Sequence, residues 1–350
     1  MEIKTRPHGG KWLNREPKAR TWKYTQAELA ELQSKDLDFK IEWARARIQG
    51  ALEKSSCPSC AFSAGKDSTV LLHLLRQYKS DIITIYGNTT IEFPECIKFA
   101  HRLRDEWNLV YYEAKPEITF WQVVEEYGWP LMGKTFGVGG VAHKSSRAIF
   151  FGDLAEKGEL TGEYAIQAKV PISSACCSFL KERPSKKLQK QLGVDTVFLG
   201  IMASESRQRM FNFLQYGEWY YPKSQHLWKC HPLAIWLNDD IWEYIHRFNV
   251  PYASLYDMGF HDNAGNWISH KRNGCMFCGM DIRFPNNHLA IMRRTHPKAW
   301  ETVMIRKGLG EVLIKLKLEL SQQYDLFEML DQEWDVKKCI ERLPCIFDQI

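Results

Sequence analysis

The sequence predicts an α/β protein built on a doubly wound parallel sheet, with N-terminal helices and a helical C-terminal subdomain. The strand candidates are the short apolar segments 60–62, 81–86, 109–113 and 196–201. Apolar residues at helical spacing separate the first three of them, around 70–75 and 95–107. Strands that alternate with helices long enough to cross over form parallel sheets covered on both faces.

The elements follow in order along the chain. Residues 26–54 have apolar positions at three-to-four spacing and no proline, which predicts helices. The strand at 60–62 leads through a turn of small residues into the apolar run 70–75 at helical pitch. Residues 81–86 are rich in β-branched side chains, as a buried strand requires. The strand at 196–201 resumes the sheet after a long interruption.

Three parts of the chain are expected. Residues 1–55 hold a basic arm and the N-terminal helices, and residues 56–225 form the nucleotide-binding α/β domain. A glycine-rich insertion at 128–172 is interpreted as a lid, because long irregular segments inside compact domains are usually binding loops. Residues 226–350, rich in tryptophan-bearing helical segments, form a C-terminal subdomain that carries the last Cys-x-x-Cys pair.

The composition is that of a packed globular enzyme. Hydrophobic residues make up 45% and charged residues 25%, which excludes a disordered chain. No apolar run reaches the roughly 18 residues of a membrane-spanning helix. Residues 1–8 lack the apolar stretch of a secretory signal. We therefore expect a cytoplasmic protein with no membrane partner.

The first 23 residues account for the whole net charge of +5. They hold seven basic residues against Glu2 and Glu16. The basic residues are Lys4, Arg6, Lys11, Arg15, Lys18, Arg20 and Lys23. With Trp12 and Trp22 among them, this arm suits contact with a polyanion such as DNA, since Lys and Arg make most phosphate contacts. A solvated or partner-docking arm is the other interpretation, and the small number of charges favours it.

A phosphate-binding turn is predicted at Ser63-Ala64-Gly65-Lys66-Asp67-Ser68, between the first strand and its helix. Small residues let backbone N–H groups converge on a phosphate, and the helix N-terminus adds a favourable dipole. Lys66 can neutralise the β- and γ-phosphates of ATP, while Ser63 and Ser68 can donate hydroxyl hydrogen bonds. Asp67 can orient the lysine or help to hold Mg²⁺. The strand-to-helix context argues against an ordinary connection with a chance Gly-Lys pair.

Ten cysteines without an export signal indicate metal or redox chemistry rather than disulfides. Two pairings compete for a four-thiolate site: the pair Cys275 and Cys278 with either Cys57 and Cys60 or Cys176 and Cys177. Four thiolates suit either zinc or a 4Fe–4S cluster, and their spacing does not distinguish the two. Merely buried thiols are a third interpretation.

Phe62-Ser-Ala-Gly-Lys-Asp-Ser-Thr69 resembles the PP-loop of the adenine-nucleotide α-hydrolase superfamily, and companion segments resemble its phosphoadenosine phosphosulfate (PAPS) reductase family. Segments in the family's order are 88–95, 200–209, 231–236 and 249–259. In the first, Asn88 replaces an acidic residue and Thr90 a glycine. In the second, which is similar to Gly-x-Arg-x-x-Glu-Ser-x-x-Arg, Met202 replaces an arginine.

The resemblance implies specific site residues. Those implied to contact the nucleotide are Phe62, Ser63, Ala64, Gly65, Lys66, Asp67, Ser68, Asn88, Thr89, Glu92, Gly200, Glu205 and Arg207. Catalytic roles are implied for Lys66, Asp67, Lys181 and Arg209. Tandem cysteines with a later Cys-x-x-Cys are typical of iron-sulfur members, which implies a 4Fe–4S cluster on Cys176, Cys177, Cys275 and Cys278. The implied cluster has a structural or electrostatic role, and Lys181 couples it to the nucleotide's anionic group.

Two reactions stay open. The first is an ATP pyrophosphatase that adenylates an oxyanion, after which a sulfur donor such as a cysteine desulfurase displaces the adenylate. The family's DNA phosphorothioation proteins are most similar to this combination of loop and cysteines. The second is reduction of adenylyl sulfate or PAPS to sulfite with thioredoxin. Cys339 and Cys345 lack the Glu-Cys-Gly motif that carries the nucleophile in the family's reductases.

Other expectations concern partners. An inert nucleotide-sensing subunit is the alternative from another functional class, for which Asn88 and Met202 are the hints. A homo-oligomer is compatible with the sequence, which does not decide the oligomeric state.

Overall fold

The structure, a computed structural model, describes residues 22–131, 173–223, 225–282 and 287–315. The basic arm up to residue 21 lies outside the described residues, as do Cys339 and Cys345. So does nearly all of the insertion expected at 128–172.

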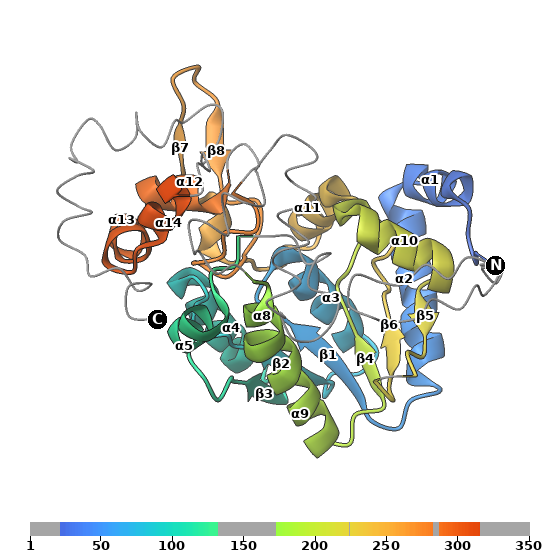
Figure 1. The fold of residues 1–350 in the computed structure, drawn as a ribbon. Helices are drawn as coiled ribbons and strands as arrows, with labels where there is room; N and C mark the ends of the chain where they lie inside the picture. The colour runs from blue at the N-terminus through green and yellow to red at the C-terminus, as the bar shows by residue number, and fades with distance from the viewer. Residues whose placement is uncertain (1–21, 132–172, 224, 283–286, 316–350) are drawn as a thin grey trace, which may run out of the picture.

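A six-stranded sheet forms the centre of the molecule, in the order β3-β2-β1-β4-β6-β5 (Figure 1). Its strands are β1 (Pro58–Phe62), β2 (Ile83–Gly87), β3 (Tyr111–Ala114), β4 (Thr196–Phe198), β5 (Trp219–Tyr220) and β6 (Trp228–Cys230). Only the β5–β6 pair is antiparallel in this sheet. The predicted parallel α/β sheet is confirmed. It extends past residue 225, where the α/β domain was expected to end, because β6 pairs with β4.

The strand order reverses between β1 and β4. From β1 the chain winds outward through β2 and β3, then returns to the other side of β1, so that Cys60 pairs with both Thr84 and Phe198. In open α/β sheets, ligands bind at such a reversal, outside the carboxyl ends of the strands. The topology therefore points to the segments that follow Phe62 and Phe198.

Helices surround the sheet, and a small hairpin stands apart from it. In chain order the helices are α1 (Gln26–Ser34), α2 (Leu37–Leu52), α3 (Lys66–Arg76), α4 (Pro94–Glu106), α5 (Phe120–Tyr127), α8 (Ala175–Cys177), α9 (Arg183–Gln191), α10 (Arg207–Tyr216), α11 (Asn238–Arg247), α12 (His288–Thr295), α13 (Pro297–Glu301) and α14 (Leu309–Lys315). The hairpin of β7 (Gly259–His261) and β8 (Trp267–Ser269) projects beside α12 (Figure 1). No described helix is long and apolar enough to cross a membrane.

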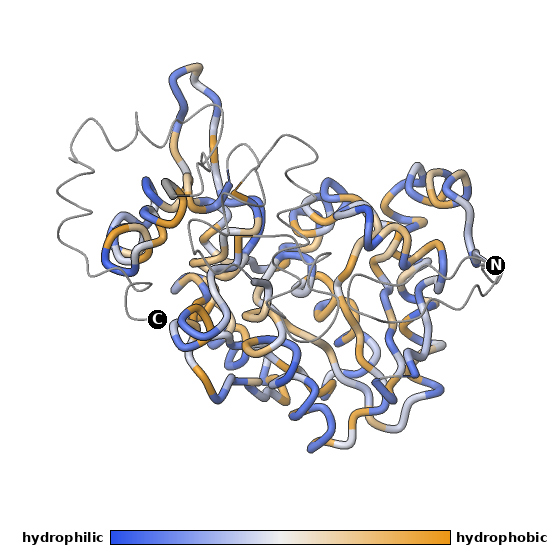
Figure 2. The backbone as a smooth tube through the Cα atoms, viewed as in Figure 1, coloured by the Kyte–Doolittle hydropathy of each residue, from blue (hydrophilic) through white to orange (hydrophobic). Residues whose placement is uncertain are grey.

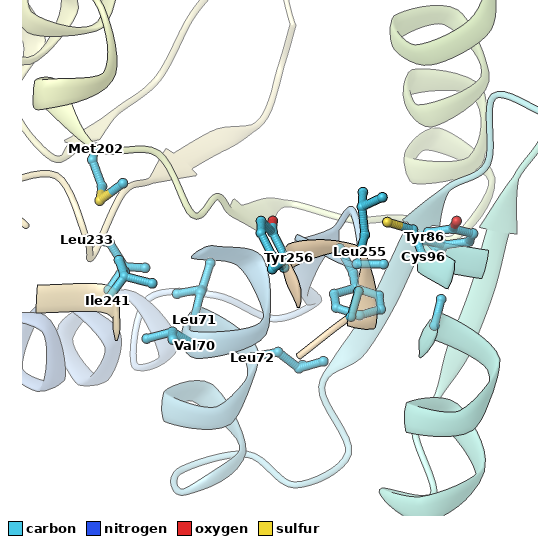
Figure 3. Packing of buried hydrophobic residues seen from close by; sticks show 14 of the residues in the cluster. Val70, Leu71, Leu72, Tyr86, Cys96, Met202, Leu233, Ile241, Leu255 and Tyr256 are labelled. Atoms are coloured by element: carbon cyan, nitrogen blue, oxygen red, sulfur yellow. The ribbon is translucent and has the colours of Figure 1, made fainter. Parts of the chain in front are cut away.

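Apolar side chains cover both faces of the sheet, because successive residues of a strand point to opposite sides. Tyr86 of β2 belongs to the main core, whereas its neighbour Ile85 packs with Ala114 on the face covered by α9. Apolar residues follow the strands and the inner sides of the helices (Figure 2). In the main core, Leu71 of α3 lies near Leu233 and Ile241 (Figure 3). The sheet is thus covered on both sides, as a doubly wound fold requires.

A buried ion pair joins the N-terminal helices to the C-terminal part of the chain. The Nζ atom of Lys40 in α2 lies 2.7 Å from Oδ2 of Asp240 in α11, and both side chains are largely buried. The same carboxylate accepts a hydrogen bond from the backbone N–H of Leu237 at 2.6 Å. The indole of Trp236 also donates to the Lys40 carbonyl at 3.2 Å. The N-terminal helices are therefore part of the main body.

We expect Lys40→Ala to lower the free energy of unfolding by about 3 kcal/mol, because it leaves the Asp240 carboxylate buried without a counter-ion. Urea denaturation measures this change. Lys35→Ala is the matched control: its exposed pair with Glu31 spans 3.2 Å, and its loss should cost less than about 0.5 kcal/mol. Equal losses in the two variants would contradict a structural role for the Lys40 pair.

Candidate functional site

The turn after β1 is built from small residues that fold back on themselves. Ala64 has a left-handed backbone with φ of 59°, and Gly65 is the N-cap of α3. The Ser68 hydroxyl accepts the backbone N–H of Ser63 at 3.2 Å and donates to the Gly65 carbonyl at 2.9 Å. This closes a compact loop at the N-terminus of an eleven-residue helix. Such a loop presents N–H groups and the positive end of the helix dipole, the arrangement that binds phosphate.

Two glycines allow other segments to touch this loop. A Cβ atom on Gly65 would lie 2.4 Å from Oδ1 of Asn273. A Cβ atom on Gly200, just after β4, would lie 2.9 Å from the backbone carbonyl oxygen of Asp67. Neither φ is left-handed, so the need for glycine here is one of space rather than backbone conformation. Gly200 therefore brings the segment after β4 against the first turn of α3.

A cavity of about 610 Å³ opens beside the loop. It is lined by Lys66 and Asp67 of α3, by Glu205 after β4, and by Lys271 and Arg272 after β8, together with Met202, Ser204, Asn238, Trp242, Tyr256, Trp267, Ser269 and His270. The Nζ atom of Lys66 is 2.7 Å from Oδ1 of Asp67, so the acid does hold the lysine. The cavity lies at the reversal of strand order and contains both cations and carboxylates.

The segment after β4 holds its charged groups together. The Glu205 carboxylate contacts the Arg209 guanidinium and accepts the backbone N–H of Met202 at 2.9 Å. Arg272 donates to the Glu205 carbonyl at 3.2 Å. Burial, with the nearby charge of Arg272, lowers the pKa of Arg209. An anion in the cavity would relieve this repulsion. Arg207, by contrast, is exposed at the start of α10 and does not line the cavity.

Asn88, Thr89 and Glu92 do not line the cavity either. The amide of Asn88 donates to Glu113 at 3.1 Å and accepts the backbone N–H of Thr90 at 2.9 Å. Although partial burial opposes it, hydrogen bonds from Lys115, Asn88 and His101 hold the pKa of Glu113 at about 2. Thr90, in place of the family's glycine, keeps a left-handed φ of 68°. The hydrogen bond to Asn88 therefore stabilises the left-handed backbone at Thr90, a conformation that glycine adopts without strain.

The structure brings Cys176 and Cys177 together with Cys275 and Cys278. A hydrogen bond with Cys177, burial, and the proximity of Cys278 and Cys275 raise the pKa of Cys176. Burial and Cys275 raise the pKa of Cys278 to about 12. We call Cys176, Cys177, Cys275 and Cys278 the cysteine quartet.

The competing pair lies elsewhere. Cys60 is fully buried in β1, and the Cys57 thiol donates to the Leu192 carbonyl at 3.4 Å, on the face covered by α9. Of the two pairings that the sequence left open, the structure therefore gathers the one that includes the tandem cysteines.

Lys181 lies between the cysteine quartet and Glu92. Attraction to Cys275 raises its pKa against the effect of burial, and Glu92 adds to this. Glu92 itself is buried, which raises its pKa, while hydrogen bonds from Thr89 and the charge of Lys181 oppose the rise. The backbone of Glu92 also bridges to Cys275. The expected side chains at 89, 92 and 181 thus surround the cysteines rather than the cavity.

The donor set of the quartet fits a bound cationic centre. A metal centre can hold as thiolates four thiols that raise one another's pKa, and Lys181 places a positive charge beside them. Among the described residues, no three Cys, His, Asp or Glu side chains are gathered closely enough to hold a single metal ion.

Several site residues were not predicted from the sequence patterns. Tyr256 accepts the backbone N–H of Lys66 at 3.1 Å, and Asn273 donates to the Ser63 carbonyl at 2.6 Å. Lys271 and Arg272 line the cavity from the segment after β8. The basic pair ahead of Cys275 is a visible signal for an anion site, but nothing local indicates that it faces Lys66.

The chain is similar to known proteins over much of its length. The chain matches the phosphoadenosine phosphosulfate reductase domain over residues 58–135 and 153–279. It is 25% identical over 234 residues to a phosphoadenosine 5′-phosphosulfate reductase of Xylella fastidiosa (strain M23), covering 66% of this chain and 81% of that protein. An uncharacterized Methanocaldococcus jannaschii protein is 26% identical over 259 residues, covering 73% of this chain and 42% of that protein.

Solved structures are similar at lower levels. A PAPS reductase from Candida auris, in a phosphate complex, aligns with a TM-score of 0.41 and 17% identity over 68% of this chain and 94% of that one. A Candida glabrata FMN adenylyltransferase in complex with ATP aligns with a TM-score of 0.38 and 15% identity over 66% of this chain and 65% of that one. Since the family match spans more than half of the residues and includes the loop, the Glu205 segment and the second cysteine pair, the chain belongs to the phosphoadenosine phosphosulfate reductase family.

Proposed function

We propose that the chain is an ATP pyrophosphatase of this family, which adenylates an oxyanion acceptor for sulfur transfer in the cytoplasm. One observation carries the proposal: Lys66, Asp67 and Glu205 face one cavity at the N-terminus of α3. A lysine and loop N–H groups suit a pyrophosphate, and carboxylates are the ligands that Mg²⁺ prefers. A substrate with only an α-phosphate and a sulfate does not need the complete set.

In the proposed reaction the loop holds the pyrophosphate end of ATP. Ser63, Ser68 and the loop N–H groups bind its oxygens, and Lys66 neutralises their charge. The acceptor oxyanion forms a bond to the α-phosphorus as the bond to the bridging oxygen breaks, and pyrophosphate leaves with the electron pair. Asp67 and Glu205 would hold Mg²⁺, which neutralises phosphate charge in such transfers. Catalysis rests on positioning and on cations already present, with Arg209 and Arg272 supporting the anion.

The cysteine quartet is proposed to hold a 4Fe–4S cluster. The quartet joins cysteines from two segments, and Lys181 and the buried Glu92 lie beside it. A bound cluster would supply a fixed charge and a rigid cross-link beside the nucleotide. Lys181 then lies between this group and Glu92, where it can orient an anionic part of the substrate.

DNA is a candidate acceptor. The arm of residues 1–23 is basic, and it enters the described part of the chain at Trp22, an exposed aromatic side chain 6.0 Å from the exposed Phe211 of α10. Exposed aromatic rings beside basic residues suit base stacking and phosphate contact. The sulfur donor would be a cysteine desulfurase.

Reduction of adenylyl sulfate or PAPS is the second candidate. The names of the relatives favour it, since the Xylella protein is a phosphoadenosine 5′-phosphosulfate reductase. It requires a cysteine nucleophile and a thioredoxin partner. The candidates Cys339 and Cys345 lie outside the described residues and lack the family's Glu-Cys-Gly context.

We expect Lys66→Ala to weaken binding of Mg²⁺-ATP by about 100-fold, because a charged hydrogen-bond donor to the phosphates is removed. Isothermal calorimetry measures the affinity. Lys79→Ala, which removes an exposed lysine paired with Asp81, is the control and should bind like the wild type. Unchanged affinity in Lys66→Ala would refute the loop assignment.

Two assays run side by side distinguish the reactions. With ATP, an oligonucleotide and a sulfur donor, the proposed enzyme should release pyrophosphate. With adenylyl sulfate or PAPS and thioredoxin, it should release no sulfite. Sulfite without ATP consumption would establish the reductase instead, and neither product would favour an inert nucleotide-sensing subunit.

Anaerobically purified protein should be brown and contain about four irons per chain. Cys275→Ser should lose most of the iron, because it removes one thiolate of the quartet. Cys57→Ser should keep it, since the Cys57 thiol contacts Leu192 just after α9, whereas Cys176 and Cys177 lie at the opposite, N-terminal end of that helical run. Zinc in place of iron, or equal loss in both variants, would contradict the assignment.

A further inference from the structure

We infer that Asn273 is a positioning residue that couples the cysteine quartet to the phosphate loop, so that nucleotide binding and exposure of the quartet control each other. The inference rests on the proposed function only in taking the loop as the place where a phosphate or sulfate ester binds. No sequence motif assigns Asn273 a role.

The side chain of Asn273 touches the phosphate loop itself. Its Nδ2 atom donates to the Ser63 carbonyl at 2.6 Å. The Oδ1 atom of the same amide is packed against Gly65. A Cβ atom added to Gly65 would lie only 2.4 Å from it. Asn273 is thus seated on the turn between Ser63 and Gly65, and the turn has no room to move toward it.

The backbone of Asn273 reaches the same loop through Tyr256. The buried Tyr256 hydroxyl is hydrogen-bonded to the backbone of Asn273. It also accepts the backbone N–H of Lys66 at 3.1 Å. That N–H is the first of α3 and belongs to the group that would face a bound phosphate. A ligand that binds beside this N–H therefore also acts on Tyr256 and on its contact with Asn273.

The same short segment contacts the 88–92 loop two and three residues later, through Cys275 and Met276. The backbone N–H of Met276 donates to the Ile91 carbonyl at 2.7 Å. The Cys275 sulfur lies 3.6 Å from the Thr89 hydroxyl, and the backbone of Cys275 bridges to Glu92. Residues 273–276 therefore contact the phosphate loop at one end. At the other end they carry Cys275 of the quartet and contact the segment that holds Glu92.

Coupling follows from this geometry. Only Gly274 separates Cys275 from Asn273, so a shift of one residue is transmitted to the other through two peptide units. A ligand that fixes the loop should keep Cys275 in place, and a group bound by the quartet should favour the loop conformation that binds phosphates. Such coupling is reciprocal by thermodynamic necessity, and its usual size is about 5- to 150-fold.

The test measures how fast Cys275 is labelled by N-ethylmaleimide, using peptide mass spectrometry and full-length protein from which bound metal, and then the chelator, have been removed. A saturating concentration of α,β-methylene-ATP with Mg²⁺ should slow labelling of Cys275 about fivefold or more in the wild type. Cys57, which contacts Leu192 on the α9 side of the sheet, is the internal reference and should be labelled at the same rate with and without the analogue.

Asn273→Ala should abolish this protection even when calorimetry shows the analogue bound. Asn263→Ala, at the exposed tip of the β7–β8 hairpin, is the matched control and should keep it. A purely structural role for Asn273 would raise labelling of Cys275 equally with and without the analogue, leaving the ratio unchanged. Tyr256→Phe, which removes only the hydroxyl link, should reduce protection and serves if Asn273→Ala does not fold.

The inference is overturned if the wild type shows no protection, or if Asn273→Ala keeps it in full. Failure of the proposed function gives a different result. If the ATP analogue does not bind the wild type, the same labelling is measured with adenosine 5′-phosphosulfate, and protection by that ligand supports the coupling while rejecting the ATP reaction.

Discussion

The site depends on close backbone contact around the first turn of α3. Gly200 leaves no side chain between the segment after β4 and the carbonyl of Asp67, and Gly65 leaves room for Asn273. Any side chain at Gly200 would meet backbone atoms, which cannot rotate away as a flexible side chain can. The positions of Glu205, Arg209 and the cavity all follow from this approach, since they are carried by the segment that Gly200 admits.

Charge is divided between two neighbouring regions. Lys66, Lys271 and Arg272 line the cavity beside the carboxylates Asp67 and Glu205, so that cations outnumber acids, as suits a phosphate site. The cysteine quartet has the opposite character, because its thiols raise one another's pKa and Lys181 opposes them. The 88–92 turn lies beside the quartet, and its Glu92 backbone bridges to Cys275. An anionic substrate and a thiolate-held group can therefore be adjacent while each has its own compensating cations.

Departures from the family pattern have structural explanations in two cases. Thr90 keeps a left-handed backbone without the help of glycine, because the side chain of Asn88 accepts its N–H. Met202 is buried in the main core (Figure 3). Where the family pattern has a charged arginine, this chain therefore has an apolar side chain that packs in the core. Arg272, brought in from after β8 and bonded to the Glu205 carbonyl, supplies a cation close to that segment.

The sequence by itself determined the local elements of this protein. Strand β1, the small-residue loop and helix α3 were predictable from apolar patterning and turn chemistry, because each depends on neighbours along the chain. Strands β5 and β6 were not, since they are short and no long apolar run marks them as 196–201 marks β4.

Tertiary structure alone decided which distant groups meet. It chose Cys176 and Cys177 over Cys57 and Cys60 as partners of Cys275 and Cys278, because β1 fixes Cys60 inside the sheet. It also placed Tyr256 and Asn273 on the phosphate loop, 190 and 210 residues along the chain from their partners. Such contacts depend on how the C-terminal segment packs across the end of the sheet, and no local pattern of residues records that packing.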